Sequence, residues 1–242
     1  MILAIDAGNS RIKWGLHDNT DWIASGRGID IAELTVAWAA LPEPERIIIV
    51  NVAGECIQAG LLDAVARWHV APTWVNSSIS ACGVRNSYEN PGQLGADRWA
   101  ALIGARHRHR DACLVVNAGT ALTIDMLSAD GVFLGGIIVP GYTSMRQALA
   151  TNTAALALQP GEFTRFPLNT GDAIASGAVQ AMAGAVQRMA EEASVVWARK
   201  PVCILSGGDA ATLRPHLNLK LKLVDNLVLE GLLVLARTPV SL

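Results

Sequence analysis

Short apolar runs, each ending at a turn, follow one another along the first half of the chain. Ile47–Val50 is a continuous apolar run, which is typical of a strand buried on both faces. Farther on, Leu61, Leu62, Val65 and Trp68 recur at helical spacing. The first half therefore predicts strands over 2–6, 11–16, 22–26, 46–52 and 73–76, and helices over 31–40, 55–68 and 94–109.

The second half repeats this order of elements. It predicts strands over 113–117, 121–127, 132–139, 202–206 and 221–224, and helices over 143–150, 172–198, 209–216 and 226–237. Three strands in a meander followed by alternating helices and strands resemble a ribonuclease-H-like unit. Two such units in tandem resemble the acetate and sugar kinase, Hsp70 and actin superfamily. We therefore expect an α/β protein of two tandem ribonuclease-H-like domains, residues 1–111 and 112–242, with a nucleotide cleft between them.

One short motif recurs at the matching place of each half. Ile2–Ser10 and Leu114–Thr120 each carry an apolar strand into a polar side chain, a glycine and a hydroxyl group. These residues are Asp6, Gly8 and Ser10 in the first half and Asn117, Gly119 and Thr120 in the second. The glycines permit positive φ and close approach of a ligand, and a hairpin tip rich in N–H groups suits phosphate oxygens. One such hairpin would be an ordinary turn. Their recurrence favours a polyphosphate site, as in an ATP-using enzyme.

Residues Gly95–Arg98 open the helix that joins the two halves. The Asp97 carboxylate is suited to accept a proton from a substrate hydroxyl, and the Arg98 guanidinium to bind a carboxylate or phosphate. The alternative is that Asp97 only caps the helix and Arg98 is solvated. Position alone leaves both interpretations open. Tyr88, in the loop before this segment, either lines a pocket or pins the loop.

Three further pairs have both a structural and a functional interpretation. Gly135–Gly136 lies inside a predicted strand and indicates close backbone approach, either to the neighbouring domain or to a ligand. Gly207–Gly208 follows another strand, where an adenine ring could lie flat against the backbone. Asn169–Thr170 precedes the long helix, and either residue could be its cap.

Composition narrows the class of protein. With a net charge of −2, the 242 residues give no electrostatic case for binding nucleic acid directly. The basic run Arg106–Arg110 ends a predicted helix and complements its dipole. The longest apolar stretches, such as Leu227–Ala236, are too short to cross a membrane. No signal peptide precedes the first strand, and the four cysteines have no metal-binding spacing, so we expect reduced thiols in a cytoplasmic protein.

A hydrophobic fraction of 51% with 17% charged residues indicates apolar surface that a partner subunit covers. The long helix predicted over 172–198 is rich in small side chains that permit close helix approach. We expect a homodimer that shares this helix, with the following alanines at the interface: Ala173, Ala175, Ala178, Ala181 and Ala185.

Taken together, these motifs closely resemble the type III pantothenate kinases along the whole chain. The segments that carry the resemblance are Asp6-x-Gly8-Asn9-Ser10-x-x-Lys13, Tyr88, Gly95-x-Asp97-Arg98, Ala118-Gly119-Thr120, Gly135-Gly136, Pro140-Gly141, Asn169-Thr170, Ser176-Gly177, Gly207-Gly208 and Leu229-x-Gly231-Leu232. The resemblance implies phosphorylation of pantothenate by ATP to 4′-phosphopantothenate, the first step of coenzyme A biosynthesis. It also implies Mg²⁺ with ATP and a homodimer whose active sites lie near the subunit interface.

The resemblance also implies a role for each matching residue. Asp97 would be the general base, and Asp6 would hold magnesium through water. The implied ATP-binding residues are Asp6, Ala7, Gly8, Asn9, Ser10, Lys13, Thr120, Gly207 and Gly208. The implied pantothenate-binding residues are Tyr88, Gly95, Ala96, Asp97, Arg98 and Thr170, the last from the facing subunit.

One departure from the family is visible. Asn117 occupies a position where the family commonly carries an aspartate that helps to bind a monovalent cation, K⁺ or NH₄⁺. An amide keeps an acceptor oxygen but lacks the full charge, so we expect weaker dependence on that cation.

Two alternatives remain open: another kinase of the same superfamily, and a catalytically idle nucleotide-binding regulator such as a transcription accessory factor. The intact Asp6, Asp97 and Arg98 argue against lost catalysis.

Overall fold

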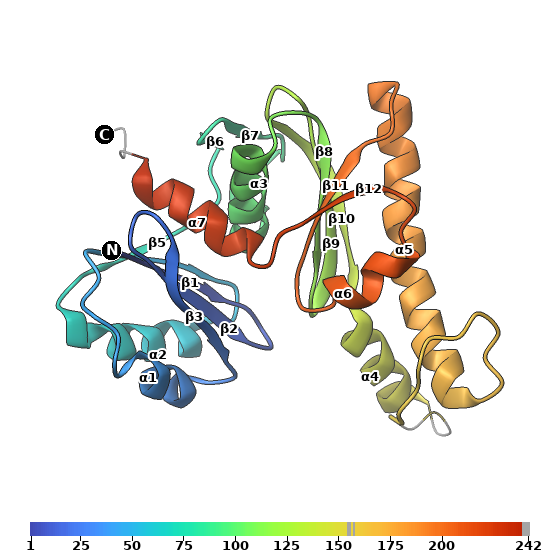
Figure 1. The fold of residues 1–242 in the computed structure, drawn as a ribbon, viewed down its shortest axis with the longest axis horizontal. Helices are drawn as coiled ribbons and strands as arrows, with labels where there is room; N and C mark the ends of the chain where they lie inside the picture. The colour runs from blue at the N-terminus through green and yellow to red at the C-terminus, as the bar shows by residue number, and fades with distance from the viewer. Residues whose placement is uncertain (154–155, 157, 239–242) are drawn as a thin grey trace. The chain divides into compact units, whose positions relative to one another are not determined.

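The computed structural model describes residues 1–153, 156 and 158–238. The chain forms two compact units: Met1–Arg110 together with Asn226–Leu242, and Asp111–Asp225 (Figure 1). This division differs from the expected domains 1–111 and 112–242 in that the C-terminal helix groups with the first unit and Asp111 with the second. Among the described residues, no helix has both the length and the apolar character that crossing a membrane requires.

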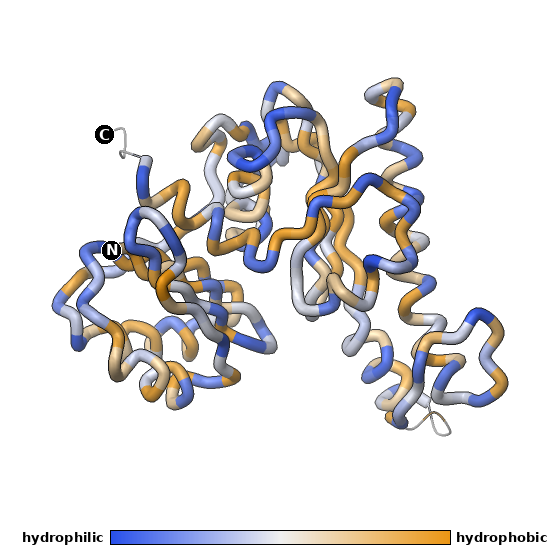
Figure 2. Tube along the Cα trace, viewed as in Figure 1, coloured by the Kyte–Doolittle hydropathy of each residue, from blue (hydrophilic) through white to orange (hydrophobic). Residues whose placement is uncertain are grey.

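The first unit is built on a five-stranded sheet in the order β3-β2-β1-β4-β5. Its strands are β1 (Ile2–Ala7), β2 (Ile12–His17), β3 (Trp22–Gly28), β4 (Arg46–Asn51) and β5 (Pro72–Trp74). The first three form the predicted antiparallel meander, and β1 pairs in parallel with β4. Figure 2 shows hydrophobic residues gathered along the strands, which agrees with the buried positions of β1 and β4.

Helices cover both faces of this sheet. Figure 1 shows α1 (Ile31–Trp38) and α2 (Glu55–Val65) on one face and α7 (Leu227–Arg237) on the other. A short 3₁₀ turn (Ala66–Trp68) follows α2. In the core of this unit, the rings of Trp14 and Trp68 both pack against that of Trp38.

The helix α3 (Ala96–Arg108) is packed against α7 through glycines on both helices. A Cβ at Gly104 would lie 2.5 Å from the carbonyl oxygen of Leu227, and one at Gly231 would overlap the carbonyl of Ala100. Only glycine permits so close a crossing. This packing, together with the contacts of α7 with β1 and β4, explains why the last helix belongs to the first unit.

The second unit repeats the sheet of the first, with neighbouring strands in the order β12-β11-β8-β9-β10. These strands are β8 (Cys113–Ala118), β9 (Ala121–Leu127), β10 (Val132–Pro140), β11 (Val202–Ser206) and β12 (Lys220–Leu223). Both units therefore have the meander and the parallel strands of a ribonuclease-H-like domain, and the predicted α/β fold class is confirmed.

The helices of the second unit are α4 (Tyr142–Asn152), α5 (Thr170–Trp197) and α6 (Ala210–Leu213), followed by a 3₁₀ turn (Arg214–His216). The long helix α5 buries Met182, Val186 and Ala190 against the sheet. None of the four cysteines, all of which lie in the described part of the chain, forms a disulfide; Cys113 and Cys203 are buried, whereas Cys56 is exposed.

Sequence patterns missed three short elements before α3. They are β6 (Ser80–Ala81), β7 (Val84–Asn86) and a 3₁₀ turn (Pro91–Gln93). Elements of two or three residues contain too few positions for a repeating hydrophobic pattern to be recognised.

Candidate active site

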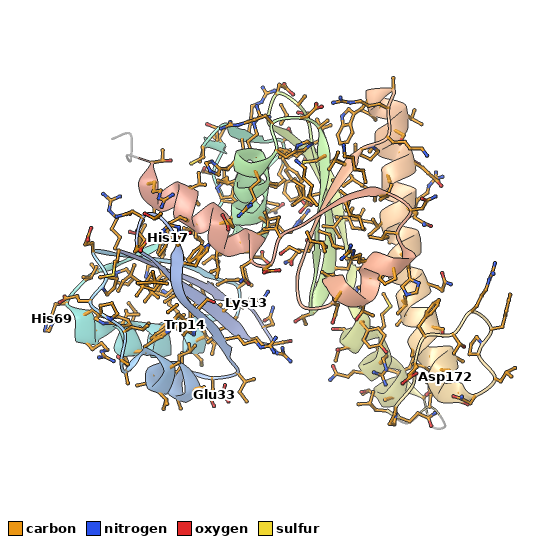
Figure 3. All side chains as sticks on the ribbon, in the orientation of Figure 1. Lys13, Trp14, His17, Glu33, His69 and Asp172 are labelled. Atoms are coloured by element: carbon orange, nitrogen blue, oxygen red, sulfur yellow. The ribbon has the colours of Figure 1, made fainter. Side chains whose placement is uncertain are left out.

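The hairpin after β1 forms the predicted first loop. Asp6 lies directly opposite Lys13 in the strand register. Figure 3 labels Lys13 beside Trp14 on β2; Trp14 is buried in the core, and successive strand side chains point to opposite faces. At the tip, the Gly8 N–H donates to the carbonyl oxygen of Arg11 at 3.2 Å. Asn9 and Ser10, which lie between these two residues, are exposed.

Burial raises the pKa of Asp6 to about 6, an effect that the positive charge of Lys13 opposes and the negative charge of Asp97 reinforces. Asp6 on β1 and Asp97 on α3 therefore lie near enough for their charges to interact. Two interacting carboxylates, one of them desolvated, form an environment that favours a cation. The oxygen donors present here fit Mg²⁺, which prefers carboxylates and water.

Helix α3 begins with the Gly95–Arg98 segment that the sequence singled out. Its interior, from Arg98 to Ala105, is buried, so the charged groups concentrate at its two ends. The Asp97 Oδ1 atom accepts a hydrogen bond from the Arg98 N–H at 2.8 Å. A Cβ at Gly95 would lie 2.7 Å from the same oxygen, so glycine leaves room for the carboxylate. Asp97 therefore satisfies a first-turn N–H without being the N-cap, which is Gly95, and its charge acts on Asp6.

The Arg98 side chain is only 5% exposed, so the alternative of a solvated arginine is wrong. Its Nη1 atom donates to the Tyr88 hydroxyl oxygen at 3.0 Å. The guanidinium carbon lies 5.8 Å from the centroid of the tyrosine ring. The loop tyrosine and the helix arginine therefore form one cluster, beside the Asp97 carboxylate in sequence.

The hairpin between β8 and β9 forms the second predicted loop. The Gly119 N–H donates to the carbonyl oxygen of Ala121 at 3.0 Å. The carbonyl oxygen of Thr120 accepts from the Gly141 N–H at 2.9 Å and from the Ser144 hydroxyl at 2.7 Å. Sequence reasoning missed Ser144, because no motif marks it. The Thr120 residue itself is exposed at the tip.

The two loop glycines do not use the positive φ that glycine permits. Neither Gly8 nor Gly119 is among the glycines with positive φ. A Cβ at these positions would make ordinary contacts, at 3.4 Å from the Arg11 carbonyl and 3.8 Å from the Ala121 carbonyl. Positive φ is found instead at Gly207, whose φ is +105°.

Gly207 is packed against β8, the strand that leads into the second loop, a neighbour that the sequence did not predict. A Cβ on Gly207 would overlap the backbone of Ala118, and the Asp209 N–H donates to the Ala118 carbonyl oxygen at 2.9 Å. Gly208 is exposed, with open space where a Cβ would stand. The first glycine of the pair is thus required by packing, and the second leaves open backbone.

The close approach at Gly135–Gly136 is to the neighbouring strand of the same sheet. A Cβ on Gly136 would overlap the carboxylate of Asp125 on β9, and the register shifts between Phe133 and Gly135. This pair therefore shapes the sheet, a role that neither interpretation of the sequence predicted.

Asn169, rather than Thr170, is the N-cap of α5. Its side-chain oxygen accepts from the Asp172 N–H at 2.9 Å. Thr170 is exposed at the first turn of α5, the turn that also contains Asp172, which Figure 3 labels.

Comparison with known proteins identifies the family of the chain. The family profile of the type III pantothenate kinases matches residues 2–192. A type III pantothenate kinase from Aromatoleum aromaticum is 52% identical over 98% of each chain. Another, from Nitrosospira multiformis, is 47% identical over 98% of this chain and 91% of the relative.

Among solved structures, a candidate 2-dehydro-3-deoxygalactonokinase from Sinorhizobium meliloti has a TM-score of 0.65 and 16% identity over the whole of both chains, which shows a shared fold. The profile match and the two relatives assign the chain more narrowly. The chain belongs to the type III pantothenate kinase family, whose activity is the ATP-dependent phosphorylation of pantothenate in coenzyme A biosynthesis.

Proposed function

We propose that this protein transfers the γ-phosphoryl group of ATP to the primary hydroxyl of pantothenate, giving 4′-phosphopantothenate and ADP in the cytoplasm. Membership of the family supports the reaction. The observation that carries the residue assignments is the cluster in the first unit: interacting Asp6 and Asp97 carboxylates, with buried Arg98 bonded to Tyr88.

Asp97 acts as the general base. Its carboxylate accepts the proton of the substrate hydroxyl as that oxygen forms a bond to the γ-phosphorus and the bond to the ADP oxygen breaks. Phosphoryl transfer depends on positioning and charge neutralisation rather than covalent catalysis by the protein. A site built from carboxylates, a lysine and an arginine suits this reaction.

The residues that hold the substrates differ in chemistry. Arg98 binds the pantothenate carboxylate through the planar donors of its guanidinium group, with Tyr88 beside it. Ala7, Gly8, Asn9, Ser10 and Lys13 bind ATP phosphates at the first hairpin.

The second unit supplies the remaining contacts to ATP. Thr120 contributes its hydroxyl to the terminal phosphate, and the open backbone at Gly208, which Gly207 positions, accepts the adenine. Asp6 holds Mg²⁺ through water, and the ion neutralises charge on the phosphates when bound.

Thermal protection tests the substrate assignment. Pantothenate at one hundred times its Kd should stabilise the protein by about 2.7 kcal/mol, whereas a hexose should not. Arg98→Lys keeps the charge but loses the planar donors, so the protection should weaken. Arg85→Ala, at an exposed arginine of the same unit, is the control. Protection by a hexose and not by pantothenate would assign the protein to a sugar kinase, and protection by ATP alone to a nucleotide-binding regulator.

We further infer that the protein is a homodimer. The five alanines expected at the interface do not share one face, because Ala175 and Ala178 are buried within the unit. Ala173, Gly177, Ala181 and Gly184 are exposed along the outer face of α5 instead. Phe166 and Leu168, in the segment before α5, are 79% and 99% exposed. We propose this surface for the interface, with Thr170 and Ala96 near the shared substrate site.

The oligomeric state can be measured directly. Light scattering at micromolar concentration should give twice the mass of one chain, which is 25.5 kDa. Leu168→Glu should dissociate the dimer without unfolding it, since the side chain is already exposed, and Leu62→Glu on α2 is the matched control. A fully active monomer of the parent protein would contradict both the dimer and the shared site.

A further inference from the structure

The loop that carries Tyr88 is fastened at both ends by one side chain, that of Asn86. Asn86 is the last residue of β7 and is only 6% exposed. Its Oδ1 atom accepts from the Tyr88 N–H at 3.1 Å, and its Nδ2 atom donates to the carbonyl oxygen of Pro91 at 3.1 Å. The amide thus spans the loop and uses both its acceptor and a donor.

The far end of the loop is fixed by other bonds as well. The Pro91 carbonyl oxygen also accepts from the Ser77 hydroxyl at 2.8 Å and from the Leu94 N–H at 3.3 Å. The Asn86 N–H donates to the Ile79 carbonyl oxygen at 2.9 Å. The Pro91 carbonyl oxygen therefore keeps two partners if the Asn86 side chain is removed. At the other end, the Tyr88 N–H loses its hydrogen bond to Asn86 Oδ1.

We propose that Asn86 is a positioning residue for the acceptor substrate. It fixes the backbone of Tyr88, whose hydroxyl oxygen accepts from Arg98 Nη1 at 3.0 Å, and so sets the orientation of the arginine. The role in pantothenate binding rests on the function proposed above for Tyr88 and Arg98. The coupling of Asn86 to Tyr88 and Arg98 rests on the hydrogen bonds alone.

The chemistry of asparagine suits this task better than that of related side chains. The bonds to Tyr88 and Pro91 require one acceptor and one donor on the same planar group. Aspartate supplies only acceptors and would face the Pro91 carbonyl oxygen with a negative charge. Alanine supplies neither and leaves the Tyr88 N–H without this partner.

Steady-state kinetics of Asn86→Ala and Asn86→Asp give the first test. For Asn86→Ala, the KM for pantothenate should rise about tenfold, while kcat and the KM for ATP stay within about twofold, because the loop holds only the acceptor substrate. Asn86→Asp should give an intermediate rise, since it keeps the acceptor for the Tyr88 N–H. Ser77→Ala, which loses a bond to Pro91 but none to Tyr88, is the control and should behave as the parent. Equal effects of Ser77→Ala and Asn86→Ala would overturn the proposal.

A double-mutant cycle tests whether Asn86 acts through Tyr88. In a Tyr88→Ala background, Asn86→Ala should raise the pantothenate KM less than twofold, because the residue that it positions is already absent. Independent effects that multiply would show that Asn86 does not act through the tyrosine.

A structural readout separates this inference from the proposed function. The chain has two tyrosines, Tyr88 and Tyr142, so 3-fluorotyrosine labelling gives two fluorine resonances. Asn86→Ala should shift the Tyr88 resonance, assigned with Tyr88→Phe, and leave that of Tyr142 in place. If the parent does not phosphorylate pantothenate, the proposed function fails while this spectrum still tests the positioning. An unchanged Tyr88 resonance would overturn the inference whatever the activity.

Discussion

The hairpin after β1 and the hairpin after β8 have the same sequence pattern, but their surroundings differ. The first has a carboxylate, Asp6, opposite Lys13, and a glycine whose Cβ position meets only an ordinary contact. The second has the neutral Asn117, and the backbone of its tip is braced by Gly141 and Gly207. The comparison teaches that one motif occurs in two settings: the first hairpin carries charged side chains at its base, and the second is neutral at the matching position and is packed against glycines.

The largest effect is expected at the charged cluster of the first unit. Asp97→Asn keeps the shape of the side chain and an oxygen for the Arg98 N–H, but it cannot accept the substrate proton. We expect kcat to fall by about 10²–10⁴-fold with an unchanged melting temperature. Turnover near the parent rate would show that Asp97 serves only the helix terminus.

Glycine substitutions test the difference in bracing. Gly207→Ala should lower the free energy of unfolding by about 2–4 kcal/mol, because φ is positive there and the added methyl would overlap Ala118. Gly8→Ala should change it by less than about 1 kcal/mol. Urea unfolding of both variants measures the two values. Similar losses would mean that the two loops are equally constrained.

The charge of Asp6, which distinguishes the first hairpin from the second, can be measured through the free energy of unfolding. The folded pKa of Asp6, about 6, lies above its ordinary value of 3.8, so the fold disfavours the ionised form. This cost is complete above pH 6 and disappears as pH falls toward 4. Asp6→Asn should therefore raise the free energy of unfolding by roughly 1–3 kcal/mol at pH 8 without magnesium, and by progressively less below pH 6. Asp63→Asn, at an exposed position, is the control. An Asp6→Asn variant less stable than the parent at pH 8 would contradict the assignment of a disfavoured charge.

The smallest effect on activity is expected at Asn117, in the hairpin after β8. With Asn117 in place, added potassium or ammonium should raise the initial rate only slightly over a bulky organic cation at matched ionic strength. Asn117→Asp should increase this dependence, because a carboxylate near phosphates needs a cation beside it. A large activation of the parent by potassium would show that the amide suffices. No change in the variant would give Asn117 a purely structural role at the turn.

Local patterns predicted the parts of the fold that depend on local contacts. The two hairpins and the buried helix α3 follow from apolar runs that end in turn residues. The position of α7 could not be predicted in this way, because an apolar helix face does not indicate which sheet it covers. The close crossing of α3 and α7 at Gly104 and Gly231 determines that position. Positive φ at Gly207 instead of Gly8 depends likewise on neighbours distant in sequence.

The candidate site was predictable as a set of residues but not as a set of contacts. The ordered motifs singled out Asp6, Tyr88, Asp97 and Arg98 before any geometry was known. The burial of Arg98 and its bond to Tyr88 were not predictable, since a charged side chain at a helix start is usually solvated. The two hydrogen bonds of the Asn86 side chain could not be predicted either, because asparagine is common in turns.

The central claim is that this protein phosphorylates pantothenate with Asp97 as its base. A coupled assay of ADP release, with magnesium and ATP and with pantothenate or a panel of hexoses as acceptor, tests it most directly. We predict ADP release that requires pantothenate, forms one phosphorylated pantothenate per ADP, and falls at least about a hundredfold in Asp97→Asn. Release with a hexose, or no release with pantothenate from the folded parent protein, would contradict the claim.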